Sequence, residues 1–151
     1  MNRYELIKEV KKYFKITEFV DSEVYAIHGE RAWKFFDYNL LKAILIIRKG
    51  LNLPITINTK TMQQRGLRHN LSAIVAKKER PYLSAHCLGK ALDFNVKGMS
   101  SEDVRIWIKK NYFKFDFKIR LEHKMNGKPI SWVHIDTINE EQNEKVYLFN
   151  V

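Results

Sequence analysis

Three side chains in this sequence could together hold a metal ion: His86, Asp93 and His134. Asp93 stands between Leu92 and Phe94 in a largely apolar run, and burying an unpaired carboxylate is costly, so it should have a partner nearby. Zinc in hydrolytic sites takes three His, Asp or Glu ligands and keeps one position for water. A set of structural hydrogen bonds would suit the same residues, and their spacing alone leaves both interpretations open.

The residues around Asp93 predict a strand that presents its carboxylate on one face. From 89 to 96, small and polar residues alternate with large apolar ones, as in a strand with one buried face. Gly89 would allow the chain to turn sharply between a ligand at His86 and a ligand at Asp93.

His134 is expected on another strand, 130–137, where Trp132 and Asp136 share its face. Asp136 could orient a ligand histidine through a hydrogen bond, and an ordinary solvated aspartate fits equally well. Further strands are expected at 53–59, 117–124 and 145–151.

Apolar residues at helical spacing predict helices at 2–14, at 37–50 and after the cap residue Ser100. The second helix would begin at Asp37 and stop at Gly50.

The polar, basic stretch 60–83 has no clear periodicity, and a loop of this length in a compact domain usually carries function. We therefore expect it to face a substrate. Together these elements predict an α+β fold with a small antiparallel sheet flanked by helices. One domain would span 1–151, with 1–35 as a helical N-terminal extension packed on it.

The composition narrows the classes of partner. The 151 residues carry 27 Lys and Arg against 17 Asp and Glu, a formal charge of +10, so the surface should attract a polyanion such as nucleic acid, an anionic membrane or an acidic cell-wall polymer. The single cysteine, Cys87, excludes an internal disulfide and an all-cysteine zinc site. No signal peptide or membrane span is recognisable, so we expect a soluble monomer made in the cytoplasm.

The segment "SAHCLGKALD" matches the Ser-x-His-x-x-Gly-x-Ala-x-Asp signature of the zinc D-Ala-D-Ala metallopeptidases, and "WVHID" resembles their Trp-x-His element. In addition, "PITINT" followed by "QRGLRHN" resembles the family's strand with a following arginine and asparagine. The resemblance covers residues from about 40 to 137. This superfamily shares its fold with hedgehog signalling domains and includes D-Ala-D-Ala carboxypeptidases, vancomycin-resistance dipeptidases and bacteriophage endolysins.

The resemblance implies a hedgehog-like fold and a Zn²⁺ ion held by His86, Asp93 and His134. Arg65 would match the arginine that holds a substrate carboxylate or carbonyl, a role that suits its planar fork, with Arg68 as the alternative. Of the motif residues, Ser84 and Trp132 are expected beside the ligands or the substrate, as is Asp136.

The general base departs from the family's usual pattern, because Ser131 stands three residues before His134, where many members have a glutamate. A subset takes the base from the preceding strand, which here offers Glu122. A two-residue turn at 126–127 would pair Glu122 with Ser131 and point it away from His134. We expect instead a five-residue loop, 125–129, because it keeps Pro129 out of the strand ladder.

That loop would pair Glu122 with Trp132 and place it diagonal to His134, within reach of a common water. His123 would face the other way and be structural.

The expected function is that of a zinc-dependent peptidase that cuts peptidoglycan stem peptides, as a D-Ala-D-Ala carboxypeptidase or endopeptidase of the phage lysin type. It would act at the bacterial cell wall, after release through a partner pore protein or as part of a virion, and its basic surface would favour the anionic wall. The alternative is a zinc-stabilised wall-binding or virion structural module without turnover. A nucleic-acid-binding protein would leave the alignment of His86, Asp93 and His134 unexplained.

Overall fold

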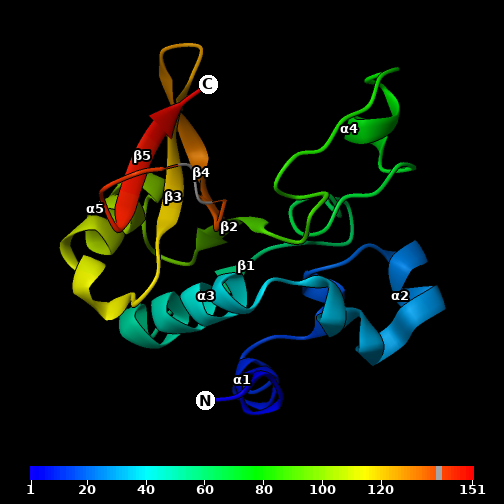
Figure 1. The fold of residues 1–151 in the computed structure, drawn as a ribbon, viewed down its shortest axis with the longest axis horizontal. Helices are drawn as coiled ribbons and strands as arrows, with labels where there is room; N and C mark the ends of the chain where they lie inside the picture. Colours follow the sequence, from blue (N-terminus) through cyan, green and yellow to red (C-terminus); the bar gives the residue numbers. More distant parts are fainter. Residues whose placement is uncertain (139–140) are drawn as a thin grey trace.

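A computed structural model describes residues 1–138 and 141–151 of the chain (Figure 1). The helices are α1 (Arg3–Val10), α2 (Ser22–His28), α3 (Tyr38–Leu51), α4 (Ala73–Ala76) and α5 (Ser101–Lys110), with short 3-10 helices η1 (Ile16–Glu18), η2 (Gly29–Phe35) and η3 (Tyr112–Lys114). The strands are β1 (Ile55–Thr56), β2 (Ala91–Val96), β3 (Ile119–Met125), β4 (Lys128–Asp136) and β5 (Val146–Asn150).

The described strands form a single mixed sheet in the order β1-β2-β4-β3-β5. The prediction of an antiparallel sheet was wrong for one pair, because β5 runs parallel to β3, with Val146 opposite Ile119. Both edges of β4 are taken by β2 and β3, and the last strand adds to the other edge of β3. It begins at the end of the sheet where β3 begins and β4 finishes, and therefore runs in the same direction as β3.

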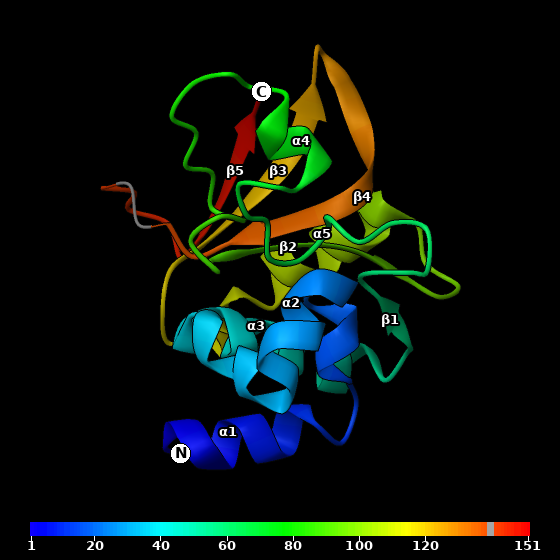
Figure 2. The same ribbon diagram turned by 90° about the vertical axis from the view of Figure 1, so that its right-hand side faces the viewer.

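The hydrophobic core lies on one face of this sheet. Alternate residues of the central strands, among them Phe94, Leu121 and Val133, are fully buried against α3 and α5. The intervening residues, including Asp93, Glu122 and His134, belong to the opposite face. In Figure 2 the helices α1, α2 and α3 lie together below the sheet.

Helix α3 begins as predicted, because the Asp37 side chain accepts hydrogen bonds from the backbone amides of Asn39 and Leu40. It does not stop at Gly50 but at Asn52, which adopts a left-handed conformation with φ 51°. Gly50 instead gives room to Trp107 of α5, whose ring would lie 2.4 Å from a Cβ atom at that position. This glycine serves helix packing rather than termination.

The N-terminal segment contributes to the same core. Helix α1 is shorter than the predicted 2–14 and starts with a capping box formed by Asn2 and Glu5. Phe14, Phe19 and Trp33 are buried in the core cluster that also contains the strands. The described residues contain no helix that is both long and apolar enough to cross a membrane.

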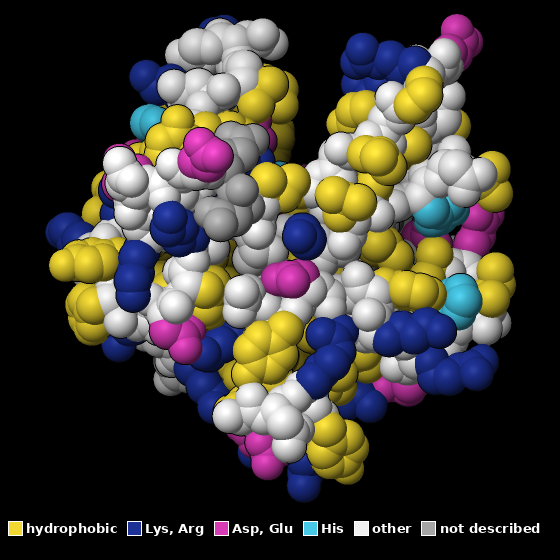
Figure 3. Space-filling model, in the orientation of Figure 1, with side chains coloured by type: hydrophobic (Ala, Val, Ile, Leu, Met, Phe, Trp, Pro, Cys, Tyr) yellow, Lys and Arg dark blue, Asp and Glu magenta, His cyan; other side chains and the backbone are white. Residues whose placement is uncertain are grey.

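The segment 60–83 is a loop with one short helix, α4, as its polar composition predicted. It forms an arm that stands apart from the strands in Figure 1. Figure 3 shows the surface hollowed between this arm and the sheet. Strand β1, just before the arm, is shorter than the predicted 53–59.

Candidate metal centre

Strand pairing aligns Asp93, His134 and Glu122 across the sheet. Asp93 of β2 lies opposite His134 of β4, and Glu122 of β3 lies opposite His134 from the other side. Directly opposed residues on neighbouring strands project from the same face. The three side chains therefore form one row on the face away from the core.

His86 completes a buried group with Asp93 and His134 that could hold a metal ion. His134 Nδ1 lies 2.8 Å from Asp93 Oδ1, and His86 Nε2 lies 3.3 Å from Asp93 Oδ2. One potential ligand atom from each residue lies within 4.8 Å of the others. The residues are only 3% (His86), 8% (Asp93) and 8% (His134) exposed.

The orientation of His86 is fixed by its own turn. His86 Nδ1 lies 2.8 Å from the carbonyl oxygen of Gly66, to which it donates, so Nε2 is directed at Asp93. Gly89, in the same turn, has φ +66°, and a Cβ atom there would lie 1.9 Å from the carbonyl oxygen of Phe35. The glycine thus allows both the turn and the close approach of η2.

His134 is held from a second direction by Asp136. His134 Nε2 lies 3.0 Å from Asp136 Oδ2, and Arg120 donates two hydrogen bonds to the Asp136 carboxylate, at 2.8 and 3.0 Å. The Arg120 guanidinium also lies over the ring of Phe149, 4.5 Å from its centroid. Sequence analysis missed Arg120, although its position two residues before Glu122 on a strand would have placed it on this face.

Glu122 lies on this face, as expected, but through a different strand register: it pairs with His134 and not with Trp132. The hairpin has the two-residue turn Asn126-Gly127, with φ 51° and 76°, so the expected loop 125–129 was wrong. Near the turn, Lys124 pairs with Pro129, and further along Glu122 pairs with His134. Between these two pairs β3 has one residue, His123, whereas β4 has the four residues 130–133. This irregularity brings Glu122 back to the face of His134.

Side chains from outside the hairpin stabilise its irregular segment. The buried Arg105 of α5 donates to the carbonyl oxygens of Trp132 at 3.0 Å and Ile130 at 3.2 Å. The side chain of Asn95 donates to the carbonyl oxygen of Ser131 at 2.9 Å. Carbonyl groups that leave the regular ladder are thereby satisfied.

The carboxylate of Glu122 has an unused oxygen. Glu122 is 7% exposed, and its Oε1 atom is buried without a hydrogen-bond partner among the described residues. Burial raises the pKa of Glu122 above its ordinary value. A buried, unpaired acceptor beside a group of potential metal ligands is suited to receive a proton from a bound molecule.

No family model, curated protein or solved structure matches this chain. The chemistry of the centre must therefore follow from its own residues.

The charges in the metal-free centre are strongly coupled. Burial lowers the pKa of His134, but its hydrogen bonds to Asp136 and Asp93 outweigh burial and raise that pKa to about 9. Burial raises the pKa of Asp93, and the hydrogen bond from His134 brings it well below its usual range. Burial lowers the pKa of His86. At neutral pH the group therefore consists of an ionised Asp93, a neutral His86 and a protonated His134.

The two candidate arginines have different surroundings. Arg68 Nη2 lies 3.2 Å from Asp93 Oδ2, whereas the Arg65 guanidinium donates to the carbonyl oxygen of Ile57 at 3.3 Å and to Asn95 Oδ1 at 2.5 Å. Both arginines line a cavity of about 490 Å³ that also contains Asp93. Arg68 is thus in contact with the candidate ligands, and Arg65 forms part of the nearby wall.

The remaining predicted residues have different surroundings. The Ser84 hydroxyl lies within its own turn, where it donates to Cys87 Sγ at 3.5 Å and accepts from the Cys87 amide at 3.4 Å. Trp132 lines the 490 Å³ cavity. His123 Nε2 lies 3.3 Å from Glu102 Oε2, away from His134.

A second group of potential ligands, Asp21, Glu23 and His69, is explained by structural hydrogen bonds. Asp21 Oδ1 accepts from the Val24 amide and caps α2, while its Oδ2 lies 2.6 Å from His69 Nε2. His69 Nδ1 accepts from the Leu71 amide, so the proton of a neutral ring lies on Nε2, the nitrogen that would have to bind a metal.

Proposed function

We propose that this protein is a zinc-dependent peptidase that cleaves peptidoglycan stem peptides. One observation carries the proposal: His86, Asp93 and His134 converge in a buried group, and the unpaired carboxylate oxygen of Glu122 lies beside it on the same face. The motif resemblance supplies the class of substrate.

The donor set fits zinc. Two imidazole nitrogens and one carboxylate oxygen form a typical ligand set for a catalytic zinc ion. Each histidine is oriented by a second hydrogen bond, His86 by the Gly66 carbonyl and His134 by Asp136, as is common for metal-bound histidines. When bound, zinc would supply Lewis-acid polarisation of the scissile carbonyl and a water activated for attack.

Glu122 would act as the proton carrier. Its buried position, with a raised pKa and a free Oε1 atom, suits a group that takes a proton from the attacking water and passes it to the leaving amine nitrogen. Arg68, and Arg65 behind it, would hold a carboxylate or carbonyl oxygen of the substrate in the cavity that they line. Asp136 and Arg120 would keep His134 in place.

The charge of the protein suits the proposed setting. A formal charge of +10 favours adsorption to an anionic cell wall, where a phage lysin or a virion component would act. The protein would cut the stem peptide as a carboxypeptidase or an endopeptidase, at a bond next to a D-residue.

The test is hydrolysis of purified cell walls by the zinc-loaded protein, followed by the appearance of new amino groups. A chelator should stop the reaction and added zinc should restore it. Stoichiometric zinc binding and wall binding without any new amino groups would contradict the peptidase and support a structural, wall-binding module. Absence of zinc binding would contradict both.

A further inference from the structure

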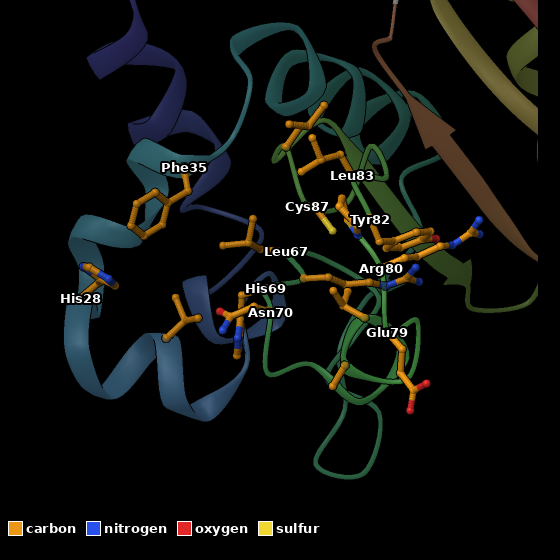
Figure 4. A pocket seen from close by; sticks show the side chains of 16 residues that line it. His28, Phe35, Leu67, His69, Asn70, Glu79, Arg80, Tyr82, Leu83 and Cys87 are labelled. Atoms are coloured by element: carbon orange, nitrogen blue, oxygen red, sulfur yellow. The ribbon is translucent and has the colours of Figure 1, made fainter.

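A larger cavity, of about 810 Å³, shares the lining residue Arg68 with the 490 Å³ cavity. It is formed between α2 and η2 on one side and the segment 67–88 on the other. Figure 4 shows His28 and Phe35 on the first wall and Leu67, Tyr82 and Leu83 on the second. The N-terminal wall belongs to the part of the chain that the motif resemblance does not cover.

Arg68 joins the two cavities. It is the lining residue that they share among those described, and its guanidinium contacts Asp93 of the metal group. Cys87 and Leu88, which follow His86 directly, line the larger cavity. Helix α4 borders both cavities, with Ile74 on the smaller and Val75 on the larger. A chain bound at the metal group could therefore extend into both cavities.

The lining of the larger cavity indicates the chemistry of its ligand. Much of it is aliphatic, and Leu83 and Leu88 are 78% and 49% exposed although they are apolar. Arg80 and Arg68, the latter paired with Asp93, carry positive charge at this cavity, and Glu79 is the single carboxylate among its described lining residues. An acidic peptide with small aliphatic side chains, which is the chemistry of a stem peptide, would match both features.

Resting on the proposed function, we infer that the larger cavity binds the stem peptide on one side of the scissile bond while the smaller cavity binds the other side. Cavities of about 300–1,000 Å³ hold drug-sized ligands, so each can take a peptide segment, and a terminal D-alanine would leave most of either one empty. The protein is then an endopeptidase that requires an extended substrate, rather than a carboxypeptidase that recognises a chain end.

Two positions on α4 provide a matched test. Ala76 lines the larger cavity, whereas Ala73 lies on the same helix and lines neither this cavity nor the smaller one. Ala76→Trp should fill the cavity. The affinity for a synthetic acidic stem pentapeptide, measured by calorimetry, should then fall by at least about tenfold, and so should kcat/KM for cleavage of that peptide. Ala73→Trp should leave both unchanged. Circular dichroism and zinc content verify that the two variants fold alike.

Charge reversal tests the acidic character of the ligand. Arg80→Glu should weaken pentapeptide binding by a similar factor, while Arg31→Glu, the same change at an exposed residue outside the cavity lining, should not. Equal affinity of the two variants would refute the electrostatic part of the inference.

The outcomes separate this inference from the proposed function. Cleavage of the pentapeptide that Ala76→Trp does not impair, or cleavage that releases only its terminal D-alanine, would overturn the two-sided cleft and leave a peptidase. Pentapeptide binding that Ala76→Trp weakens, without cleavage by the wild-type protein, would keep the cavity as a peptide site and overturn the peptidase.

Discussion

The guanidinium of Arg68 lies 3.2 Å from Asp93 Oδ2, the same oxygen that faces His86 Nε2 at 3.3 Å. In the metal-free protein a positive charge of the chain thus balances the carboxylate of the candidate ligand group. A divalent cation bound there would be repelled by this guanidinium and would compete with it for Asp93.

Replacing Arg68 should therefore strengthen zinc binding. Arg68→Gln is expected to increase zinc affinity by about tenfold, or about 1.4 kcal/mol, because the competing charge is removed. Chelator competition measures the affinity. Arg65→Gln is the matched control, since the Arg65 guanidinium donates to Ile57 and Asn95, and the Arg65 contact with Asp93 is made by its backbone carbonyl oxygen, which the substitution keeps. Weaker zinc binding by Arg68→Gln would mean that the arginine supports the ligand by orienting it.

Removing a histidine ligand should remove the metal. His134→Ala is expected to reduce zinc affinity by at least about a hundredfold, because one of three ligands is lost. His123→Ala should retain full zinc occupancy, since His123 lies beside Glu102 outside the group. Zinc content after dialysis, measured by atomic absorption, distinguishes the two. Full occupancy in His134→Ala would exclude this residue as a ligand.

Glu122→Gln should separate catalysis from metal binding. The amide cannot accept and return a proton as the carboxylate does, so hydrolysis of wall peptides should fall by about a hundredfold to ten-thousandfold with zinc binding intact. The exposed Glu144 gives the control Glu144→Gln, which should keep full activity. Undiminished hydrolysis by Glu122→Gln would assign the proton transfer to another group.

The stability of the metal-free protein should fall at alkaline pH. Burial lowers the pKa of His134, but Asp136 and Asp93 raise it to about 9 in the folded state, against 6.5 as its ordinary value. A raised pKa contributes stability that is complete below about pH 6.5 and is lost as the pH rises through about 9.

Urea unfolding of the metal-free protein at pH 6 and at pH 10 should show this difference, on the order of a few kcal/mol. In His134→Gln the pH dependence should be reduced by that amount. Equal dependence in the variant and the wild-type protein would show that His134 does not gain a proton on folding.

Gly89 should tolerate substitution far less than Gly98. Both have positive φ, but a Cβ atom at Gly89 would lie 1.9 Å from the Phe35 carbonyl oxygen, while a Cβ atom at Gly98 would meet none of the described residues within 4 Å. Gly98→Ala should cost about 1 kcal/mol of unfolding free energy, from the backbone conformation alone. Gly89→Ala should cost about 3 kcal/mol or more, because η2 must move as well. Thermal unfolding compares the two, and equal losses would contradict the steric explanation.

Local patterns predicted the strand that carries Asp93 and the starts of α3 and α5, because alternation and capping depend on residues close in sequence. The hairpin register could not be predicted in this way. It depends on Arg105 and Asn95, which satisfy carbonyl groups of the segment 130–133 from elsewhere in the fold.

Two further differences between the predicted and the observed fold, at Gly50 and at β5, also depend on segments that are distant in sequence. Gly50 signals a helix end in the sequence, and only the position of Trp107 shows that it gives room for a neighbouring helix. The parallel direction of β5 depends on the end of the sheet at which this strand begins, and the local sequence does not indicate that end.

The irregular segment 130–133 also determines how the chain can change in length. Side chains alternate along a strand, so inserting or deleting one residue between Pro129 and His134 would turn His134 and Asp136 toward the core and break the group on both sides. A change of two residues would keep the phase. Additions at the Asn126-Gly127 tip would leave the positions of His134 and Asp136 unchanged. We therefore expect the candidate metal group to tolerate added residues at the hairpin tip and to be lost when an odd number of residues is inserted or deleted in 130–133.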